Sequence, residues 1–138
     1  MSVRIAFDVG TVRIGVATCD RAGILATPQA ALAAGPKSIN SALDLIREYQ
    51  PVELIVGLPI TLKGSESAST QSARDWACQL QEATDIPVIL FDERLTTVQA
   101  QSSFARAGTN IKKSRERIDS AAAAVLLQHY LDSRPHQG

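Results

Sequence analysis

Residues 7–17 read FDVGTVRIGVA, and this stretch decides the fold expected of the chain. Residues 3–8 have the composition of a strand, Gly10 and Thr11 mark a turn, and residues 13–18 return as a second strand. Two apolar runs separated by a turn signal predict a β-hairpin. The chain is therefore expected to open with a pair of antiparallel strands.

Further elements follow on the C-terminal side of this hairpin. The segment ELIVGL at residues 53–58 is almost continuously apolar, which is the pattern of a strand buried on both faces. The other expected elements are strands at 24–32 and 87–91, and helices at 38–49 (with Ser38 as its N-cap), around 73–80, near 97–107 and at 115–131. Three strands followed by βαβ crossovers predict an α/β fold with a five-stranded mixed sheet flanked by helices.

Composition and charge restrict the class of protein. The chain has 138 residues, which suits a single domain over residues 1–138, and 45% of them are hydrophobic. The 14 basic and 14 acidic residues cancel, which argues against coating nucleic acid by bulk charge but leaves room for local patches. No apolar run is long enough to span a bilayer, and the N-terminus lacks a signal-peptide pattern, so a cytoplasmic location is expected. Cys19 and Cys78 sit in no metal-ligand spacing and are expected to be reduced core residues.

Carboxylates follow the buried elements of the chain. Asp8 ends the first strand, Asp92 and Glu93 follow the strand PVILF, and Asp119 lies near the start of the last helix, before four alanines. Carboxylates that converge repel one another unless a cation neutralises them. Mg²⁺ prefers oxygen ligands, and two such ions can cleave a phosphodiester bond. The pattern predicts a site for Mg²⁺ or Mn²⁺ in which Asp8, Glu93 and Asp119 are both the metal ligands and the catalytic residues.

Each of these acids also has a purely structural interpretation. Asp8 could be a turn residue that hydrogen-bonds its own backbone. Glu93 could form a surface ion pair with Arg94 or Lys63. Asp119 could cap the last helix. Three acids that each follow a buried element are harder to explain in this way.

The same segments resemble a known family. The chain is similar to the YqgF/RuvX family of pre-16S ribosomal RNA nucleases, which were formerly described as Holliday junction resolvases. The matching segments are FDVGTVRIGVA (7–17), IVGLPITLKGSES (55–67), FDERLTT (91–97) and KKSRERIDSAAAAVLLQHYLD (112–132). The resemblance implies an RNase H-like fold, metal-dependent phosphodiester hydrolysis and maturation of the 5′ end of 16S rRNA in ribosome biogenesis. A Holliday junction resolvase-like DNA endonuclease is the alternative.

The resemblance also assigns roles by position. It implies that Asp8 is the first-strand catalytic aspartate, Glu93 the mid-chain acid and Asp119 the acid of the C-terminal helix. Related resolvases take a glutamate from the strand that here ends in Gly57, so the acid is expected from DER instead. Asp92 remains an alternative to Glu93 as the ligand.

Basic residues surround the acidic segments. The segment KKSRER at 112–117 precedes Asp119 directly, and Arg13, Lys63 and Arg94 flank the other motifs. The expected nucleic-acid contacts from 112–117 are Lys112, Lys113, Arg115 and Arg117, on a mobile loop that grips phosphates. A solvated basic loop is the alternative. The expected partners are pre-rRNA or structured DNA or RNA and ribosomal particles, bound by a monomer or weak homodimer with no membrane involved.

Two other function classes fit parts of the pattern. An actin-like ATPase also has a DxGT hairpin, but it needs a second lobe and a second phosphate loop that this chain lacks. A catalytically silent nucleic-acid binder would not need the set of Asp8, Glu93 and Asp119. The metal-dependent nuclease accounts for more of the sequence than either.

Overall fold

The computed structural model describes residues 3–59, 67–92 and 111–133, and in the last range it describes side chains from residue 120 onward. The elements are β1 (Arg4–Val9), β2 (Arg13–Cys19), β3 (Ala26–Ala33), α1 (Ser38–Tyr49), β4 (Glu53–Leu58), α2 (Ala68–Ala83), β5 (Val88–Asp92) and α4 (Ile111–Ser133). The expected helix near 97–107 lies outside the described residues. None of the helices in the described ranges combines the length and the apolar content needed to cross a membrane.

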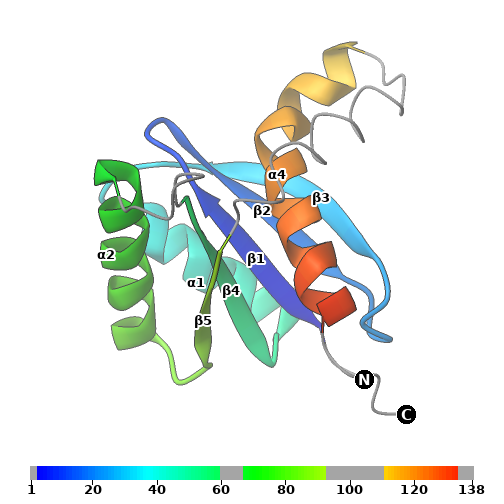
Figure 1. Ribbon diagram of the computed structural model, residues 1–138, viewed down its shortest axis with the longest axis horizontal. Coiled ribbons are helices and arrows are strands. Elements are labelled where there is room, and N and C mark those ends of the chain that lie inside the picture. Colours follow the sequence, from blue (N-terminus) through cyan, green and yellow to red (C-terminus); the bar gives the residue numbers. More distant parts are fainter. Residues whose placement is uncertain (1–2, 60–66, 93–110, 134–138) are drawn as a thin grey trace.

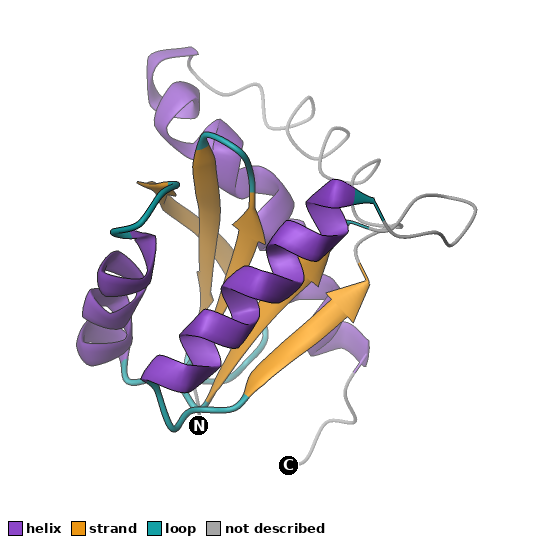
Figure 2. Ribbon diagram, turned by 90° about the vertical axis from the view of Figure 1, so that its left-hand side faces the viewer, coloured by secondary structure: helices purple, strands orange, loops and turns teal. Residues whose placement is uncertain are grey.

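The strands form one mixed sheet in the order β3-β2-β1-β4-β5. The pairs β1–β2 and β2–β3 are antiparallel, whereas β1–β4 and β4–β5 are parallel. The five-stranded mixed sheet of the sequence analysis is therefore confirmed. Because β1, β4 and β5 run in the same direction, their carboxyl ends meet at one edge of the sheet (Figure 2).

Helices cover both faces of the sheet. In Figure 1, α4 crosses in front of the sheet, α1 lies behind it and α2 runs alongside β5. One core cluster joins the sheet to α1 and α2, and a second joins it to α4. We call these two sides the α1/α2 face and the α4 face. Every core position of a strand belongs to one of them, because successive strand side chains point to opposite faces.

The two faces are filled by different side chains. On the α1/α2 face, large residues dominate, and the rings of Phe7 and Trp76 lie 5.1 Å apart. On the α4 face, the strands contribute the small Ala6 and Ala17 beside the larger Ile55, and the helix contributes Ala123 beside Leu126 and Leu127. The α4 face therefore allows the helix to approach the sheet closely.

The start of α1 differs by one residue from the sequence expectation. Lys37 is the N-cap, without a side-chain hydrogen bond, and Ser38 is the first helical residue. The buried Ser38 hydroxyl donates to Gly35 O at 2.7 Å and accepts from Trp76 Nε1 at 2.9 Å. The interpretation of Ser38 as an N-cap is wrong, because its side chain joins α1 to α2 instead of closing the end of α1.

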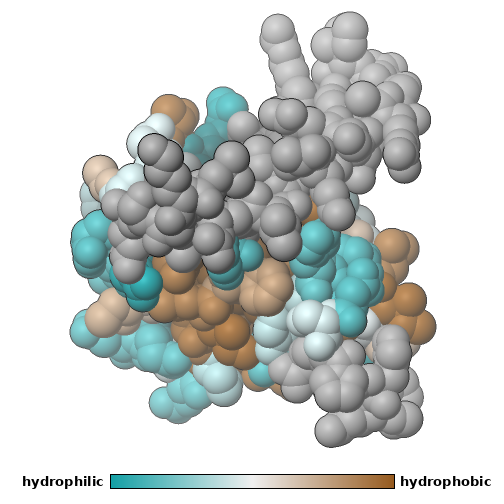
Figure 3. Space-filling model, viewed as in Figure 1, coloured by the Kyte–Doolittle hydropathy of each residue, from teal (hydrophilic) through white to brown (hydrophobic). Residues whose placement is uncertain are grey.

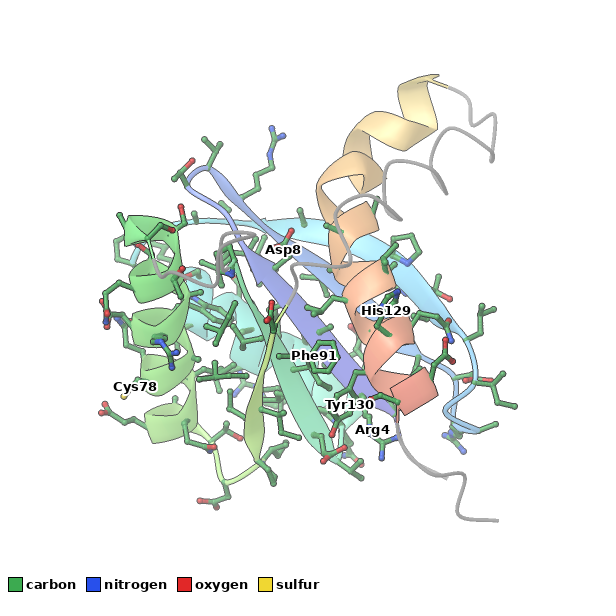
Figure 4. All side chains as sticks on the ribbon, viewed as in Figure 1. Arg4, Asp8, Cys78, Phe91, His129 and Tyr130 are labelled. Carbon is green, nitrogen blue, oxygen red and sulfur yellow. The ribbon has the colours of Figure 1, made fainter. Side chains whose placement is uncertain are left out.

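A polar cluster ties α4 to the end of the sheet opposite the parallel strand tips. Arg4 Nε and Glu53 Oε1 lie 2.6 Å apart, and these side chains are 16% and 17% exposed. The Tyr130 hydroxyl donates to both Glu53 oxygens at 3.2 Å. Figure 4 shows Arg4 and Tyr130 together at this end. The C-terminal half of α4 is thus anchored to β1 and β4.

Edge strand β5 is less covered than the central strands. All of its residues are partly buried or exposed, and Leu90 is 39% exposed. Figure 3 shows a hydrophobic area between α2 and α4 on this side of the molecule. The well-packed part of the sheet therefore centres on β1, β2 and β4.

Candidate active site

Asp8 lies within β1, one residue before the strand ends. Ile5, Phe7 and Val9 pack on the α1/α2 face, so alternation places Asp8 on the α4 face with Ala6. Asp8 is half-buried and pairs with Gly15 of β2 in the antiparallel ladder. The interpretation of Asp8 as a turn residue is wrong, because its backbone belongs to the sheet. Figure 4 shows it at the end of the sheet opposite Arg4 and Tyr130.

Glycines flank Asp8 on both neighbouring strands. Gly15 is its partner on β2, and Gly57 follows Val56, the partner of Phe7 on β4. Both glycines fall on the α4 face by alternation. The two neighbouring strands therefore place no side chain beside Asp8 in the Gly15–Asp8–Gly57 row. A carboxylate oxygen is the kind of ligand that a hard divalent cation such as Mg²⁺ prefers.

Asp92 lies on the other face of the sheet from Asp8. It pairs with Leu58 at the end of β4, and Leu58 belongs to the core of the α1/α2 face. Val88 packs on that same face, whereas Phe91 packs toward α4. The two aspartates thus lie at the same end of the strands but on opposite faces of the sheet.

The predicted basic loop before Asp119 is helical. Helix α4 begins at Ile111, so residues 112–117 form its first turns, and Asp119 lies further along the same helix. The expectation of a loop is wrong, because lysine, arginine and glutamate are good helix formers and no glycine or proline interrupts the segment. The side chains of Lys112, Lys113, Arg115, Arg117 and Asp119 lie outside the described residues.

Ser120 is a buried polar residue that the sequence analysis did not identify. Its side chain is 0% exposed, and its Oγ accepts a hydrogen bond from Val16 N at 3.0 Å. It lies on the face of α4 that carries Ala123 and Leu127, three and seven residues further on. A serine within an otherwise apolar helical row was the available signal.

Arg13, one of the expected nucleic-acid contacts, lies near the tip of the β1–β2 hairpin. Gly10 N donates to Arg13 O at 3.0 Å, and a Cβ at Gly10 would lie 2.6 Å from that oxygen. The turn therefore requires glycine at this position. Arg13 is exposed at the start of β2. The other expected contacts, Lys63 and Arg94, lie outside the described residues, as does Glu93.

A capping box joins the end of β4 to the start of α2. Ser67 accepts from Thr70 N, and Ser67 N donates to Thr70 Oγ1 at 3.0 Å. The Thr70 hydroxyl also donates to Pro59 O at 2.6 Å. The N-terminus of α2 is thus fixed beside the carboxyl end of β4.

Within the described residues, no three acidic, histidine or cysteine side chains gather into a metal-binding group.

Two side chains with shifted pKa values lie close together, one at the C-terminal end of β2 and one in the loop that follows. Burial raises the pKa of the Cys19 thiol, whose sulfur accepts from Arg4 N. Hydrogen bonds from Leu25 N and Ile24 N lower the pKa of Asp20. Both groups lie at the end of the sheet remote from Asp8.

The two cysteines differ in environment, and neither forms a disulfide. Cys19 is buried, as expected, but Cys78 is exposed on α2. The expectation that Cys78 is a core residue is wrong. The buried positions of α2 include Ala73, Trp76 and Ala77, and Cys78 falls outside that helical stripe.

Solved structures with the same architecture define the class of this protein. The chain matches Thermus thermophilus RuvC in complex with a Holliday junction substrate, with a TM-score of 0.57 and 15% identity over 97% of this chain and 96% of that one. It matches Fowlpox virus resolvase in complex with Holliday junction DNA, with a TM-score of 0.60 and 14% identity over 95% and 97% of the two chains. The fold is therefore RNase H-like, of the kind found in resolvases.

Sequence comparison narrows the class to one family. The family model described as "RuvX: Holliday junction resolvase" matches residues 2–133. A Cutibacterium acnes relative is 44% identical over 131 residues, 94% of this chain and 82% of its own length. A Mycolicibacterium smegmatis relative is 47% identical over 137 residues, 95% and 81% of the two chains. Both carry the name "Putative pre-16S rRNA nuclease". The chain belongs to the RuvX family of nucleases, enzymes that hydrolyse phosphodiester bonds.

Proposed function

We propose that this protein is a nuclease dependent on Mg²⁺ or Mn²⁺ that processes the 5′ end of pre-16S rRNA in the cytoplasm. The observation that carries the proposal is the position of Asp8, half-buried on the α4 face between Gly15 and Gly57. The names of the relatives support the substrate. Ribosomal particles are the expected setting, and the protein would act as a monomer or weak homodimer.

Strand alternation supports Glu93 over Asp92 as the second ligand. Asp92 shares the α1/α2 face with Leu58, so its side chain lies on the face of the sheet opposite to Asp8. The backbones of β1 and β5 are separated by β4, which makes them roughly 10 Å apart. The longer side chain of glutamate suits that separation better than that of aspartate. Glu93 is therefore the ligand we assign.

Helical spacing supports Asp119 as the third ligand. Position 119 precedes Ala123 by four residues and Leu126 by seven, and both of these pack on the sheet. It also directly precedes Ser120, which is hydrogen-bonded to β2 beside Gly15, the partner of Asp8. Asp119 is thus the acid of α4 best spaced to meet Asp8.

The chain's own residues would divide the work between metal and substrate. Asp8, Glu93 and Asp119 would hold a divalent ion, which when bound would supply water activation and charge stabilisation at the phosphate. Arg13, Lys63, Arg94 and the basic residues of 112–117 would bind phosphates on either side of the scissile bond. Recognition would rest on the backbone and shape of the RNA more than on base edges.

A DNA junction is the second candidate substrate, favoured by the description of the family model. Resolution of a two-fold junction requires paired cuts, which a symmetric dimer can make. The two candidates use the same carboxylates, so they differ in substrate and oligomeric state. Both quantities can be measured on one preparation.

The test compares cleavage of a 16S precursor end, unrelated single-stranded RNA and a four-way DNA junction, with Mg²⁺ or Mn²⁺. We expect faster cleavage of the precursor end, and loss of this activity in Asp8→Asn and Asp119→Asn. The loss should exceed about a hundredfold, because metal-supplied stabilisation is worth several kcal/mol and 1.36 kcal/mol is tenfold in rate. Selective cleavage of the junction would favour the second candidate. Undiminished cleavage by both variants would exclude this site.

A further inference from the structure

Side-chain hydrogen bonds hold α4 on the sheet near both ends of residues 120–133, the stretch of the helix whose side chains the structure describes. At the edge that carries Asp8, the Val16 N–H donates to Ser120 Oγ at 3.0 Å. At the opposite edge, Tyr130 donates to both oxygens of Glu53. Ten residues separate Ser120 from Tyr130, which corresponds to about 15 Å along the helix. The two contacts are therefore distinct anchors on one rigid element.

The sheet surface near the Val16–Ser120 hydrogen bond carries small side chains, which do little to fix the position of the helix along its axis. On the α4 face, Ala6 and Ala17 share a core cluster with Ala123, and Gly15 lies two residues before Ala17 on β2. Helices are positioned by ridges of side chains that fit into grooves, and residues this small form shallow ridges. Close approach is therefore easy at this end of α4, but packing restrains it less here than the larger Leu126, Leu127 and Tyr130 do further along the helix. A directional hydrogen bond is well suited to supply that restraint.

The strand presents the donor at an irregularity in the sheet. The register of β2 with β3 shifts between Ile14 and Val16, so the ladder is locally disrupted around Gly15. The Val16 N–H beside this shift finds its acceptor on α4. Its neighbour Gly15 is the partner of Asp8. One hydrogen bond thus links Val16, which directly follows the partner of Asp8 on β2, with the helix position next to Asp119.

We propose that Ser120 is a positioning residue that sets the register of α4 and so holds Asp119 at the level of Asp8. This role rests on the proposed metal site of Asp8, Glu93 and Asp119. Ser120 itself does not touch metal or substrate. It acts through the helix backbone, at a distance of one residue from the acid that it positions.

The experiment measures two quantities in Ser120→Ala: Mn²⁺ affinity by calorimetric titration and exchange of the Val16 amide proton by NMR. We expect the Val16 amide to exchange at least about tenfold faster, because its buried acceptor is lost. We expect Mn²⁺ to bind about tenfold or more weakly, as when a residue that orients a metal ligand is removed. Ser120→Thr, which retains a hydroxyl, should restore slow exchange and near wild-type affinity.

Tyr130→Phe is the matched control, since it removes the anchor at the other end of the same helix. It should lower stability but leave Mn²⁺ affinity unchanged. Equal loss of affinity in Ser120→Ala and Tyr130→Phe, or none in Ser120→Ala, would overturn the positioning role. A Val16 amide that exchanges freely in the wild-type protein would overturn it without any variant. Asp8→Asn separates the two proposals, because Mn²⁺ binding that survives this change overturns the metal site itself.

Discussion

The two faces of the sheet carry different kinds of side chain. The α1/α2 face packs Phe7 against Trp76 among leucine, isoleucine and valine side chains. The α4 face carries Gly15, Asp8 and Gly57 in one row, and α4 packs on this face through Ser120 and Ala123 as well as through Leu126 and Leu127. The first arrangement maximises buried apolar area, which is the main source of stability. The second combines apolar packing with a half-buried carboxylate. The chemistry that we propose thus lies on the side of the strands opposite to the Phe7–Trp76 core.

The largest effect expected from this difference is on stability at the α1/α2 face. Phe7→Ala removes a fully buried ring that packs on Trp76 and should cost about 3–5 kcal/mol of unfolding free energy. Urea denaturation measures this loss. Mn²⁺ affinity of the folded fraction should stay at the wild-type level, because neither side chain faces Asp8. A loss of affinity in the folded fraction would show that the two faces are not independent.

A matched pair of overpacking variants compares the faces directly. Ala42 of α1 and Ala123 of α4 are both 0% exposed, on opposite faces. Valine at either position should destabilise the fold by about 1–3 kcal/mol. Only Ala123→Val should also weaken Mn²⁺ binding, since it pushes α4 away from the sheet. Equal Mn²⁺ titrations for the two variants would contradict the division between the faces.

A smaller effect concerns pH. Burial raises the pKa of the Cys19 thiol above its ordinary value of 9.0. A raised folded-state pKa contributes stability that is present below about pH 9 and is lost as the pH rises through the folded value. Wild-type stability should therefore fall faster above pH 9 than that of Cys19→Ser, which cannot ionise there. Parallel stability curves for the two proteins would contradict this expectation.

Strands with a strong apolar pattern were predictable from sequence, whereas helix boundaries and the orientation of single side chains were less so. Residues 53–58 were placed as observed, because a continuous apolar run admits little choice of boundary. Helix α4 starts earlier than expected, since its charged first turns lack the apolar period on which the prediction depended. Ser38 was misplaced because one residue of shift along a helix changes the direction of a side chain by about 100°. Cys78 was misplaced because residue type alone does not show which face of a helix a cysteine occupies.

The candidate site was predictable in its residue types but less so in its geometry. Asp8 stands out because it ends an apolar strand. The flanking by Gly15 and Gly57 depends on strand order and register, which join residues distant in sequence. The role of Ser120 depends on a hydrogen bond across 104 residues. The sequence left the choice between Asp92 and Glu93 open, and it is the pairing of Asp92 with Leu58 that separates Asp92 from Asp8.

The most direct test of this account is a Mn²⁺ titration of Asp8→Asn and Asp92→Asn beside the wild-type protein. The two variants make the same substitution at the same edge of the sheet but on opposite faces. The account predicts that Asp8→Asn loses Mn²⁺ binding and that Asp92→Asn binds like the wild type. Loss of binding in Asp92→Asn with retention in Asp8→Asn would contradict the assignment of the metal site to the α4 face.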